Sequence, residues 1–285
     1  MTAPRRSTLR QTTPVGASRA EVPTAGVSAE RRAPSGIICG AVIAALAAAL
    51  AALAPAGDVM AQSQGDGAAA PFDPAAAVAL DRSDCEAGDP EACTSLGAAF
   101  EAGEGVRADP ARAAALYRQG CDGGDAFGCT ALASLYGQGR GVRQDDRQAA
   151  AYYRQGCDAG ESLACANLGV LYAQGLGVQQ DFNRAATLFS RACEDDEPIG
   201  CANLGAVFFE GVGAERDLPR AADLFGEACD SGYAPACNNL GWMYEQGLGV
   251  GRSAQQAIAY YREALEYDPE LGPASENLDR LGAAR

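Results

Sequence analysis

The sequence predicts an all-α protein, a solenoid of five tandem helix-turn-helix repeats of 36 residues with a half-repeat at each end. Three observations support this fold class. Ten of the eleven cysteines fall in two columns that recur every 36 residues, as one C-x7-C pair in each repeat. Columns of leucine and glycine recur with the same period, and apolar residues follow helical spacing twice within it. A fixed period of about 20 to 50 residues is typical of stacked repeat architectures.

The repeats align without a gap, and both ends of the array depart from the pattern. The repeats span residues 85–120, 121–156, 157–192, 193–228 and 229–264. Residues 73–84 match the second half of a repeat and predict an N-terminal capping helix. Residues 265–285 begin a sixth unit, with Leu265 and Pro273 in the two cysteine columns, and predict a C-terminal capping helix. Terminal repeats of solenoids commonly differ in this way because their outer faces meet water.

Each repeat predicts two helices separated by a glycine turn. Leu168, Leu171 and Tyr172 lie at helical spacing on the first helix of the third repeat, and Gly175 and Gly177 follow in the turn. One column after the turn holds side chains that accept hydrogen bonds from the first free backbone N–H groups of a helix. Its members are Asp109, Asp145, Asp181, Asp217 and Ser253. We therefore expect every second helix to begin just after this column.

One segment carries a recognisable family pattern. Leu168–Val178 reads L-G-V-L-Y-A-Q-G-L-G-V, which meets the pattern L-G-x-x-Y-x-x-G-x-G-V. It resembles the Sel-one-like repeat, a relative of the tetratricopeptide repeat, and the resemblance covers residues 85 to about 264. The resemblance implies a right-handed α/α solenoid. With cysteines in two columns, the chain looks like the secreted, cysteine-rich branch of that family.

The cysteine pairs lie where one repeat meets the next. Each C-x7-C joins the end of a second helix to the following first helix across a short turn, such as residues 122–125, and the turn brings the two cysteines together. A disulfide within each pair fits an exported protein and would stabilise the fold by roughly 2 to 3 kcal/mol per bond. The expected pairs are Cys85–Cys93, Cys121–Cys129, Cys157–Cys165, Cys193–Cys201 and Cys229–Cys237.

Metal binding or catalysis by the cysteines is a less favoured alternative. The chain has no histidine, the spacing is not C-x2-C, and neighbouring pairs are separated by a helix layer of roughly 10 Å. A catalytic thiol would also lack a histidine base. We therefore expect no metal site and no cofactor.

Residues 1–61 predict an export signal. The uncharged apolar stretch Ile37–Ala54 follows six arginines and precedes Val59-Met60-Ala61, a small-residue cleavage pattern. The alternative is an uncleaved membrane anchor, since about 18 apolar residues is the lower limit for a membrane span. Either interpretation places the repeats outside the cytoplasm, in the periplasm, secreted, or anchored to the inner membrane. Residues 62–72 then form a flexible linker.

Charge excludes one class of partner. Residues 62–285 hold 16 of the 22 basic residues, all of them arginine, and 34 of the 37 acidic residues. So acidic a surface repels phosphate backbones, because nucleic-acid binding needs a basic footprint. We expect no nucleic-acid partner, and membrane contact only through a retained N-terminal segment.

An enzymatic function is disfavoured. Some cysteine-rich relatives carry a β-lactamase or penicillin-binding label, so this activity is the alternative that the resemblance raises. The serine enzymes use S-x-x-K and K-T-G motifs, and the metal-dependent ones need histidine ligands. A chain without lysine or histidine supplies neither, and we expect no catalytic residues.

Candidate partner contacts lie on the first helices, which line the concave surface in tetratricopeptide-like arrays. Asn167, Asn203 and Asn239 occupy one column, and their amides can both donate to and accept from a peptide backbone. The alternative role is to satisfy backbone groups between helix layers. Trp242, the only tryptophan, occupies a variable position as either a partner anchor or packing near the last repeat.

The sequence thus favours an exported, monomeric repeat scaffold that binds a protein or peptide through its concave face. An adaptor role in envelope or extracellular processes fits this prediction, and regulation of envelope assembly is a second non-enzymatic possibility. The resemblance, rather than any motif, suggests these two roles.

Overall fold

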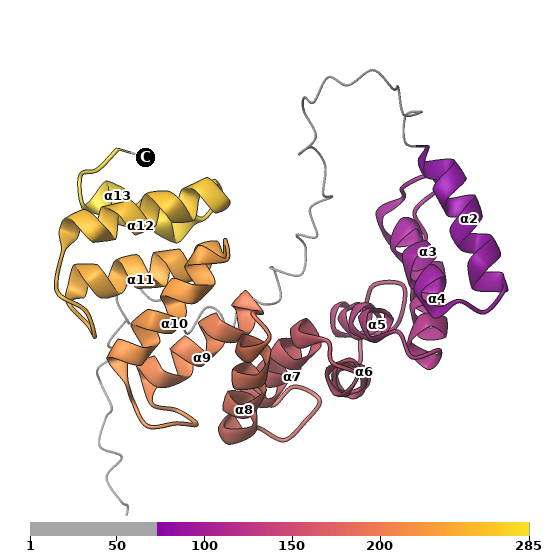
Figure 1. The fold of residues 1–285 in the computed structure, drawn as a ribbon, viewed down its shortest axis with the longest axis horizontal. Helices are drawn as coiled ribbons and strands as arrows, with labels where there is room; N and C mark the ends of the chain where they lie inside the picture. The colour runs from indigo at the N-terminus through magenta and orange to yellow at the C-terminus, as the bar shows by residue number, and fades with distance from the viewer. Residues whose placement is uncertain (1–72, 285) are drawn as a thin grey trace, which may run out of the picture. The chain divides into compact units, whose positions relative to one another are not determined.

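A computed structural model describes residues 73–284 of the chain. Within this range, regular structure consists of twelve α-helices, α2 to α13, and no strand (Figure 1). The signal peptide, the alternative membrane anchor and the linker predicted for residues 1–72 lie outside the described residues. Among the helices described, none combines the length and apolar character needed to cross a bilayer.

The helices form alternating first and second members of successive repeats. The first helices are α3 (Pro90–Ala102), α5 (Ala126–Gln138), α7 (Ser162–Gln174), α9 (Pro198–Glu210) and α11 (Ala234–Gln246). The second helices are α4 (Pro110–Asp122), α6 (Asp146–Asp158), α8 (Phe182–Glu194), α10 (Leu218–Asp230) and α12 (Ala254–Tyr267). The half-repeats at the two ends are α2 (Pro74–Glu86) and α13 (Gly272–Arg280). The predicted all-α repeat architecture is confirmed.

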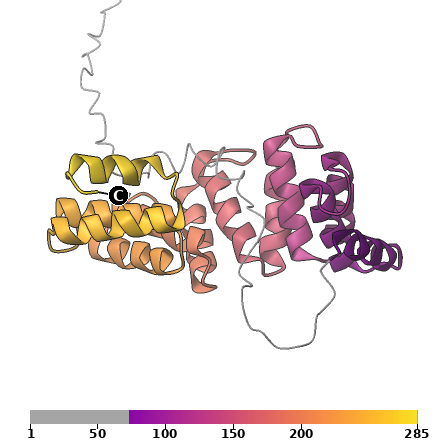
Figure 2. The same ribbon diagram turned by 90° about the horizontal axis from the view of Figure 1, so that it is seen from above.

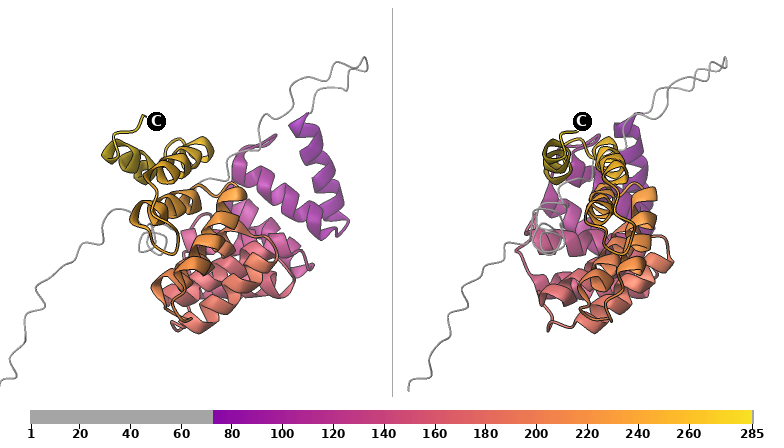
Figure 3. Two further views of the ribbon diagram at one scale, coloured as in Figure 1. Left: turned by 60° about the vertical axis from the view of Figure 1, so that its left-hand side comes forward. Right: turned by 90° about the vertical axis from the view of Figure 1, so that its left-hand side faces the viewer.

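Helices that are adjacent along the chain pack against each other throughout the stack (Figures 1 and 2). At the C-terminal end of the stack, α13 packs alongside α12 (Figure 3). Beyond these neighbours, α3 also contacts α5 and α7 contacts α9, whereas no two second helices of the described chain approach as extensively. At these two places, the first helices approach each other more closely than the second helices do. We call the surface of α3, α5, α7, α9 and α11 the first-helix face.

Side-chain caps fix where the second helices begin. Asp145 accepts hydrogen bonds from the backbone N–H groups of Arg147 at 3.0 Å and Gln148 at 3.1 Å at the start of α6. The same column caps the other second helices, through Asp109, Asp181, Asp217 and Ser253. The predicted helix starts are confirmed. Such caps satisfy N–H groups that a helix cannot pair internally.

The second glycine of each turn lets one repeat lie directly on the one before it. In the third repeat, a Cβ added at Gly177 would lie 2.1 Å from the backbone carbonyl oxygen of Asp146, at the start of α6. Gly177 also has a φ of +66°, which disfavours side chains with a Cβ. The equivalent glycines meet the preceding second helix in the same way, at Gly105, Gly141, Gly213 and Gly249. Only glycine permits this approach.

A second glycine column brings the two helices of a repeat together. A Cβ at Gly169 of α7 would lie 2.7 Å from the ring of Phe189 on α8. The same helix-to-ring packing recurs at Gly97 with Tyr117 and at Gly241 with Tyr261. In four of the five repeats, the aromatic ring of the second helix thus packs onto a glycine of the first helix at the centre of the repeat core. In the second repeat, Ala133 takes the place of this glycine.

We predict that Gly177→Ala destabilises the oxidised protein by about 2 to 4 kcal/mol, because the added methyl collides with the carbonyl of Asp146 in a strained backbone conformation. Gly137→Ala is the matched control, since its Cβ would meet nothing closer than Ala149 at 3.9 Å. That helical substitution should stabilise by about 0.5 to 1 kcal/mol. Urea unfolding followed by circular dichroism measures both; equal stability of the two variants would contradict the assignment.

Candidate functional site

The asparagine column lies in the middle of the first helices, with little exposed surface. Asn167, Asn203 and Asn239 are 7%, 6% and 3% exposed. The Nδ2 of Asn203 donates to the carbonyl oxygen of Ile199, one turn earlier in α9, at 2.8 Å. The column thus lies on the expected helices, and at least one of its amides donates a hydrogen bond to the backbone of its own helix. A contact between this column and a partner stays a prediction.

Trp242 packs between two first helices. It lies on α11 with 8% of its surface exposed, and its ring meets that of Phe209 on α9 edge-on, with centroids 6.0 Å apart. Edge-to-face pairs at this distance are favourable. Trp242 therefore fills the space between α9 and α11 in the free protein, and its use as a partner anchor stays a prediction.

Between α7 and α9, one repeat earlier, the equivalent space is open. The positions equivalent to Phe209 and Trp242 hold Ala173 on α7 and Ala206 on α9, which leave a cavity of about 50 Å³ between these helices. Side chains of α8 form another part of its lining. The full lining comprises Val170, Ala173, Phe182, Ala185, Phe189, Asn203, Ala206, Val207, Glu210 and Val212. We call this site the α7–α9 pocket.

Sequence reasoning missed this pocket, although a signal was present. The search for binding residues singled out large or polar side chains, such as Trp242. The pocket arises instead where the two residues that face each other across the interval are both small. Pairing the two columns across each pair of successive first helices would have singled out Ala173 with Ala206, the pair in which both residues are alanine.

The first helices carry acidic side chains and no arginine of their own. The five first helices, all within the described residues, carry four carboxylates and no basic side chain, whereas the arginines lie on the second helices, turns and caps. The four are Glu91, Glu101, Glu210 and Glu245. This side of the stack would favour basic over acidic partner segments.

Two of these carboxylates are held by internal partners at opposite ends of the array. Glu101 accepts from the hydroxyl of Tyr117 at 2.7 Å and pairs with Arg140 at 2.9 Å. Glu245 accepts from Tyr261 at 2.9 Å and pairs with Arg280. The hydrogen bond from Arg280 holds the pKa of Glu245 below its usual value, whereas burial raises the pKa of Tyr261. The charges of both carboxylates are therefore already paired within the protein.

Glu210 differs from these two. It ends α9 at the rim of the α7–α9 pocket, it is exposed, and the described chain gives it no ion pair. Its carboxylate is thus free to meet a cation from outside.

Near its end, each first helix carries an aromatic residue that a side chain of the following second helix covers. Arg184 lies over Tyr172 at 5.5 Å from the ring centroid, and Arg220 over Phe208 at 4.2 Å. Where glutamine replaces this arginine in the second and fifth repeats, tyrosines stack instead, as Tyr136–Tyr152 and Tyr244–Tyr260. These contacts are internal packing and leave the arginines less available for ligands.

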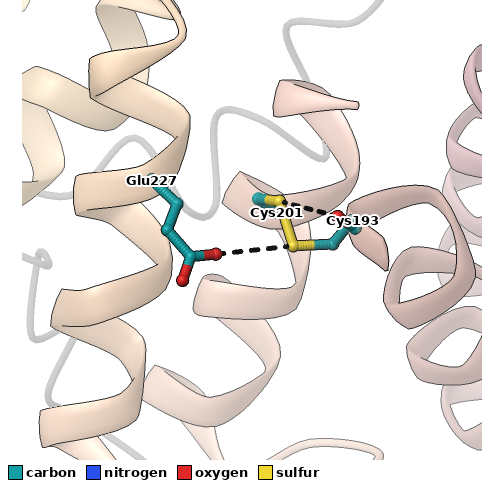
Figure 4. Close-up of side chains that lie close together, drawn as sticks. All are labelled: Cys193, Cys201 and Glu227. Atoms are coloured by element: carbon teal, nitrogen blue, oxygen red, sulfur yellow. Dashed lines mark hydrogen bonds between the residues drawn. A yellow bond between two sulfur atoms is a disulfide. The ribbon is translucent and has the colours of Figure 1, made fainter. Parts of the chain in front are cut away.

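All five predicted disulfides are present, each between cysteines eight residues apart. Nine of the ten cysteines are buried, and Cys193 is the half-buried exception. The Oε2 of Glu227, on α10, lies 3.9 Å from the sulfur of Cys193 (Figure 4). Asp196, in the same loop, adopts a φ of +58° where the other four loops have glycine. The Cys193–Cys201 bond is therefore the most accessible of the five disulfides.

The acidic side chains near two disulfides resemble metal sites only superficially. Cys193, Cys201 and Glu227 bring their ligand atoms within 4.8 Å of one another, and Glu263 lies similarly beside Cys229–Cys237. Thiolates, not disulfide sulfurs, are the usual metal ligands. With the sulfurs joined, each cluster retains one carboxylate, which is too few for a protein metal site.

We predict that Cys193–Cys201 is the first disulfide to be reduced, because attack by a thiolate requires access to sulfur. Graded treatment with glutathione, alkylation and peptide mapping measures the order, with the buried Cys157–Cys165 bond as internal control. Glu227→Gln should accelerate reduction at Cys193, since a neutral amide no longer repels the incoming thiolate. Simultaneous reduction of all pairs, or earlier loss of Cys157–Cys165, would refute this order.

Comparisons with known proteins agree with the repeat architecture. The Sel1 repeat model matches residues 90–125, 126–161, 162–197, 198–233 and 234–266. No curated protein matches the sequence significantly. Among solved structures, c5321, a protective antigen of uropathogenic Escherichia coli with an SLR fold, is similar at 28% identity and a TM-score of 0.64, covering 73% of this chain and 44% of that one. A Sel1 repeat protein from Oxalobacter formigenes is similar at 26% identity and a TM-score of 0.62, covering 72% and 58%.

The chain thus spans about half the length of these two proteins. The family model, in contrast, matches well over half of this chain, in register with its helix pairs. The chain belongs to the Sel1 repeat family.

Proposed function

We propose that this protein is an exported scaffold that binds a protein or peptide partner through its first-helix face. Sel1 repeat proteins are generally protein-interaction modules. The observation that carries the proposal for this chain is the first-helix face itself, whose helices carry carboxylates and no arginine of their own, and which is hollowed by an apolar pocket. Few polar groups around an apolar recess are typical of binding surfaces.

The proposed location is the periplasm or the cell exterior. Five disulfides suggest an oxidising compartment outside the cytoplasm, because cytosolic thiols are kept reduced. An adaptor role in envelope or extracellular processes fits such a location. Asn167, Asn203, Asn239 and Trp242 are proposed contacts within this face, through the small exposed parts of their side chains.

We further propose that the protein does not hydrolyse β-lactams. The clusters of acidic side chains in the structure lie at disulfides, helix caps and internal ion pairs. Neither lysine nor histidine exists in the chain to complete a known β-lactamase mechanism. Nitrocefin turnover by repurified protein, well above the rate in buffer, would contradict this proposal.

The binding proposal predicts a dependence on one face of the array. Gln138→Arg with Gln246→Arg places two positive charges at the ends of first helices α5 and α11, outside the α7–α9 pocket. Thr187→Arg with Gln255→Arg places two on exposed second-helix positions as the matched control. We expect the first pair to reduce partner capture from envelope extract at least about tenfold, as loss of a contact worth about 1.4 kcal/mol does. The control should retain capture.

Quantitative mass spectrometry of the oxidised, exported protein's captured partners measures this difference. Equal capture by both variants would show that the partner binds elsewhere, and absence of any specific partner would contradict the scaffold function.

A further inference from the structure

We propose that the α7–α9 pocket binds one apolar side chain of an extended partner segment, and that Glu210 pairs with a basic residue of the same segment. The inference rests on the proposed function and names the class of partner. An arginine- or lysine-containing peptide with a valine-, leucine- or methionine-sized anchor is the occupant that volume and charge favour.

The pocket lies where one interval lacks the side chains that fill the next interval along the chain. Between α9 and α11, Phe209 and Trp242 occupy the equivalent space and meet edge-on at 6.0 Å. Between α3 and α5, Glu101 at the equivalent position accepts a hydrogen bond from Tyr117 and forms an ion pair with Arg140. Between α7 and α9, both key positions are alanine. A side chain supplied from outside would restore there the packing that Phe209 and Trp242 provide one repeat later.

The size and lining of the pocket define the anchor. Its volume of about 50 Å³ is several times what one water molecule requires by this measure, so a short side chain fits. Valines from α7, from α9 and from the turn after α9 line it, as Val170, Val207 and Val212, with Phe189 of α8 beside them. An apolar lining releases poorly bound water when an apolar group enters, which favours binding.

The rim defines the charge of the partner. Glu210 is exposed and has no ion pair in the described chain, unlike Glu101 and Glu245. No arginine lies on the first helices to compete for it. Phe182, at the start of α8, also lines the pocket and remains 37% exposed, so the aliphatic stem of a basic side chain has an apolar surface to cover.

An extended partner suits the surroundings of the pocket. In the preceding interval, the position equivalent to Ala173 is Gly137, where a Cβ would meet only Ala149 at 3.9 Å. Packed helix axes lie about 8 to 10 Å apart, and an extended chain rises about 3.3 Å per residue. A peptide crossing the first helices would therefore place residues about three apart over successive intervals. This spacing favours a peptide over a compact small molecule.

The test uses defined peptides and the full exported, oxidised protein. The probe is acetyl-Gly-Arg-Leu-Arg-Gly-amide, compared with peptides in which leucine is replaced by glycine or both arginines by glutamate. Methyl NMR follows Val170, Val207 and Val212, which line the pocket. We expect saturable shifts at these methyls with the leucine peptide, and at least about tenfold weaker binding of both altered peptides.

Two protein variants separate the pocket from the rest of the face. Ala173→Phe with Ala206→Trp fills the pocket with the pair that the next interval carries, and should abolish peptide binding. Ala98→Trp makes the same kind of change at the equivalent column of α3 and should leave binding unchanged. If the filled variant does not fold, Glu210→Arg decides, with an expected loss of at least about tenfold.

The outcomes distinguish this inference from the proposed function. Methyl shifts elsewhere, unaltered binding by the filled variant or by Glu210→Arg, or no binding of any peptide in the panel would overturn the pocket assignment. If the envelope partner is still captured by the filled variant, the scaffold function stands and only the pocket assignment falls. If no partner and no peptide bind, both proposals fail.

Discussion

Every second helix from α2 to α10 is clamped at both ends to the repeat that follows it. At its carboxyl end a disulfide joins it to the next first helix, as Cys157–Cys165 joins α6 to α7. At its amino end the backbone lies against the second glycine of the next turn, at Gly177 for α6. A Cβ in that column would come within 2.1 to 2.4 Å of a backbone oxygen. Two fixed points per helix define both the separation and the rotation of successive repeats.

Because the clamps use backbone and disulfides, side chains in the other columns can vary while both clamps are kept. The first-helix face shows the result. At its two ends, Glu101 and Glu245 bind internal arginines. Between α9 and α11, an aromatic pair fills the interval, whereas two alanines leave the interval between α7 and α9 open. A binding site can thus arise from differences in side-chain volume within one repeat architecture, a property that suits repeat scaffolds.

The sequence was sufficient for the fold because the helix caps, the turn glycines and the cysteine pairs each recur five times in one register. The helix caps at Asp145 and its equivalents, the turn glycines and the cysteine pairs are local features, and the structure confirms them. The site was harder to predict because it depends on which side chains of different repeats meet. The edge contact of Phe209 with Trp242 joins two repeats, and the burial of Asn203 depends on neighbouring helices. Neither follows from the spacing within one repeat.

The arrangement of successive repeats depends on the two clamps acting together, and hydrogen exchange measures this dependence directly. The measurement compares amide protection along the oxidised wild-type protein with that of Gly177→Ala combined with Cys157→Ser and Cys165→Ser, which removes both clamps of α6. In a stack held by contacts between nearest neighbours, protection should fall mainly in α6 and α7, with α10 and α11 little affected. A uniform loss along all helices, or unchanged protection in α6 and α7, would contradict the two-clamp account.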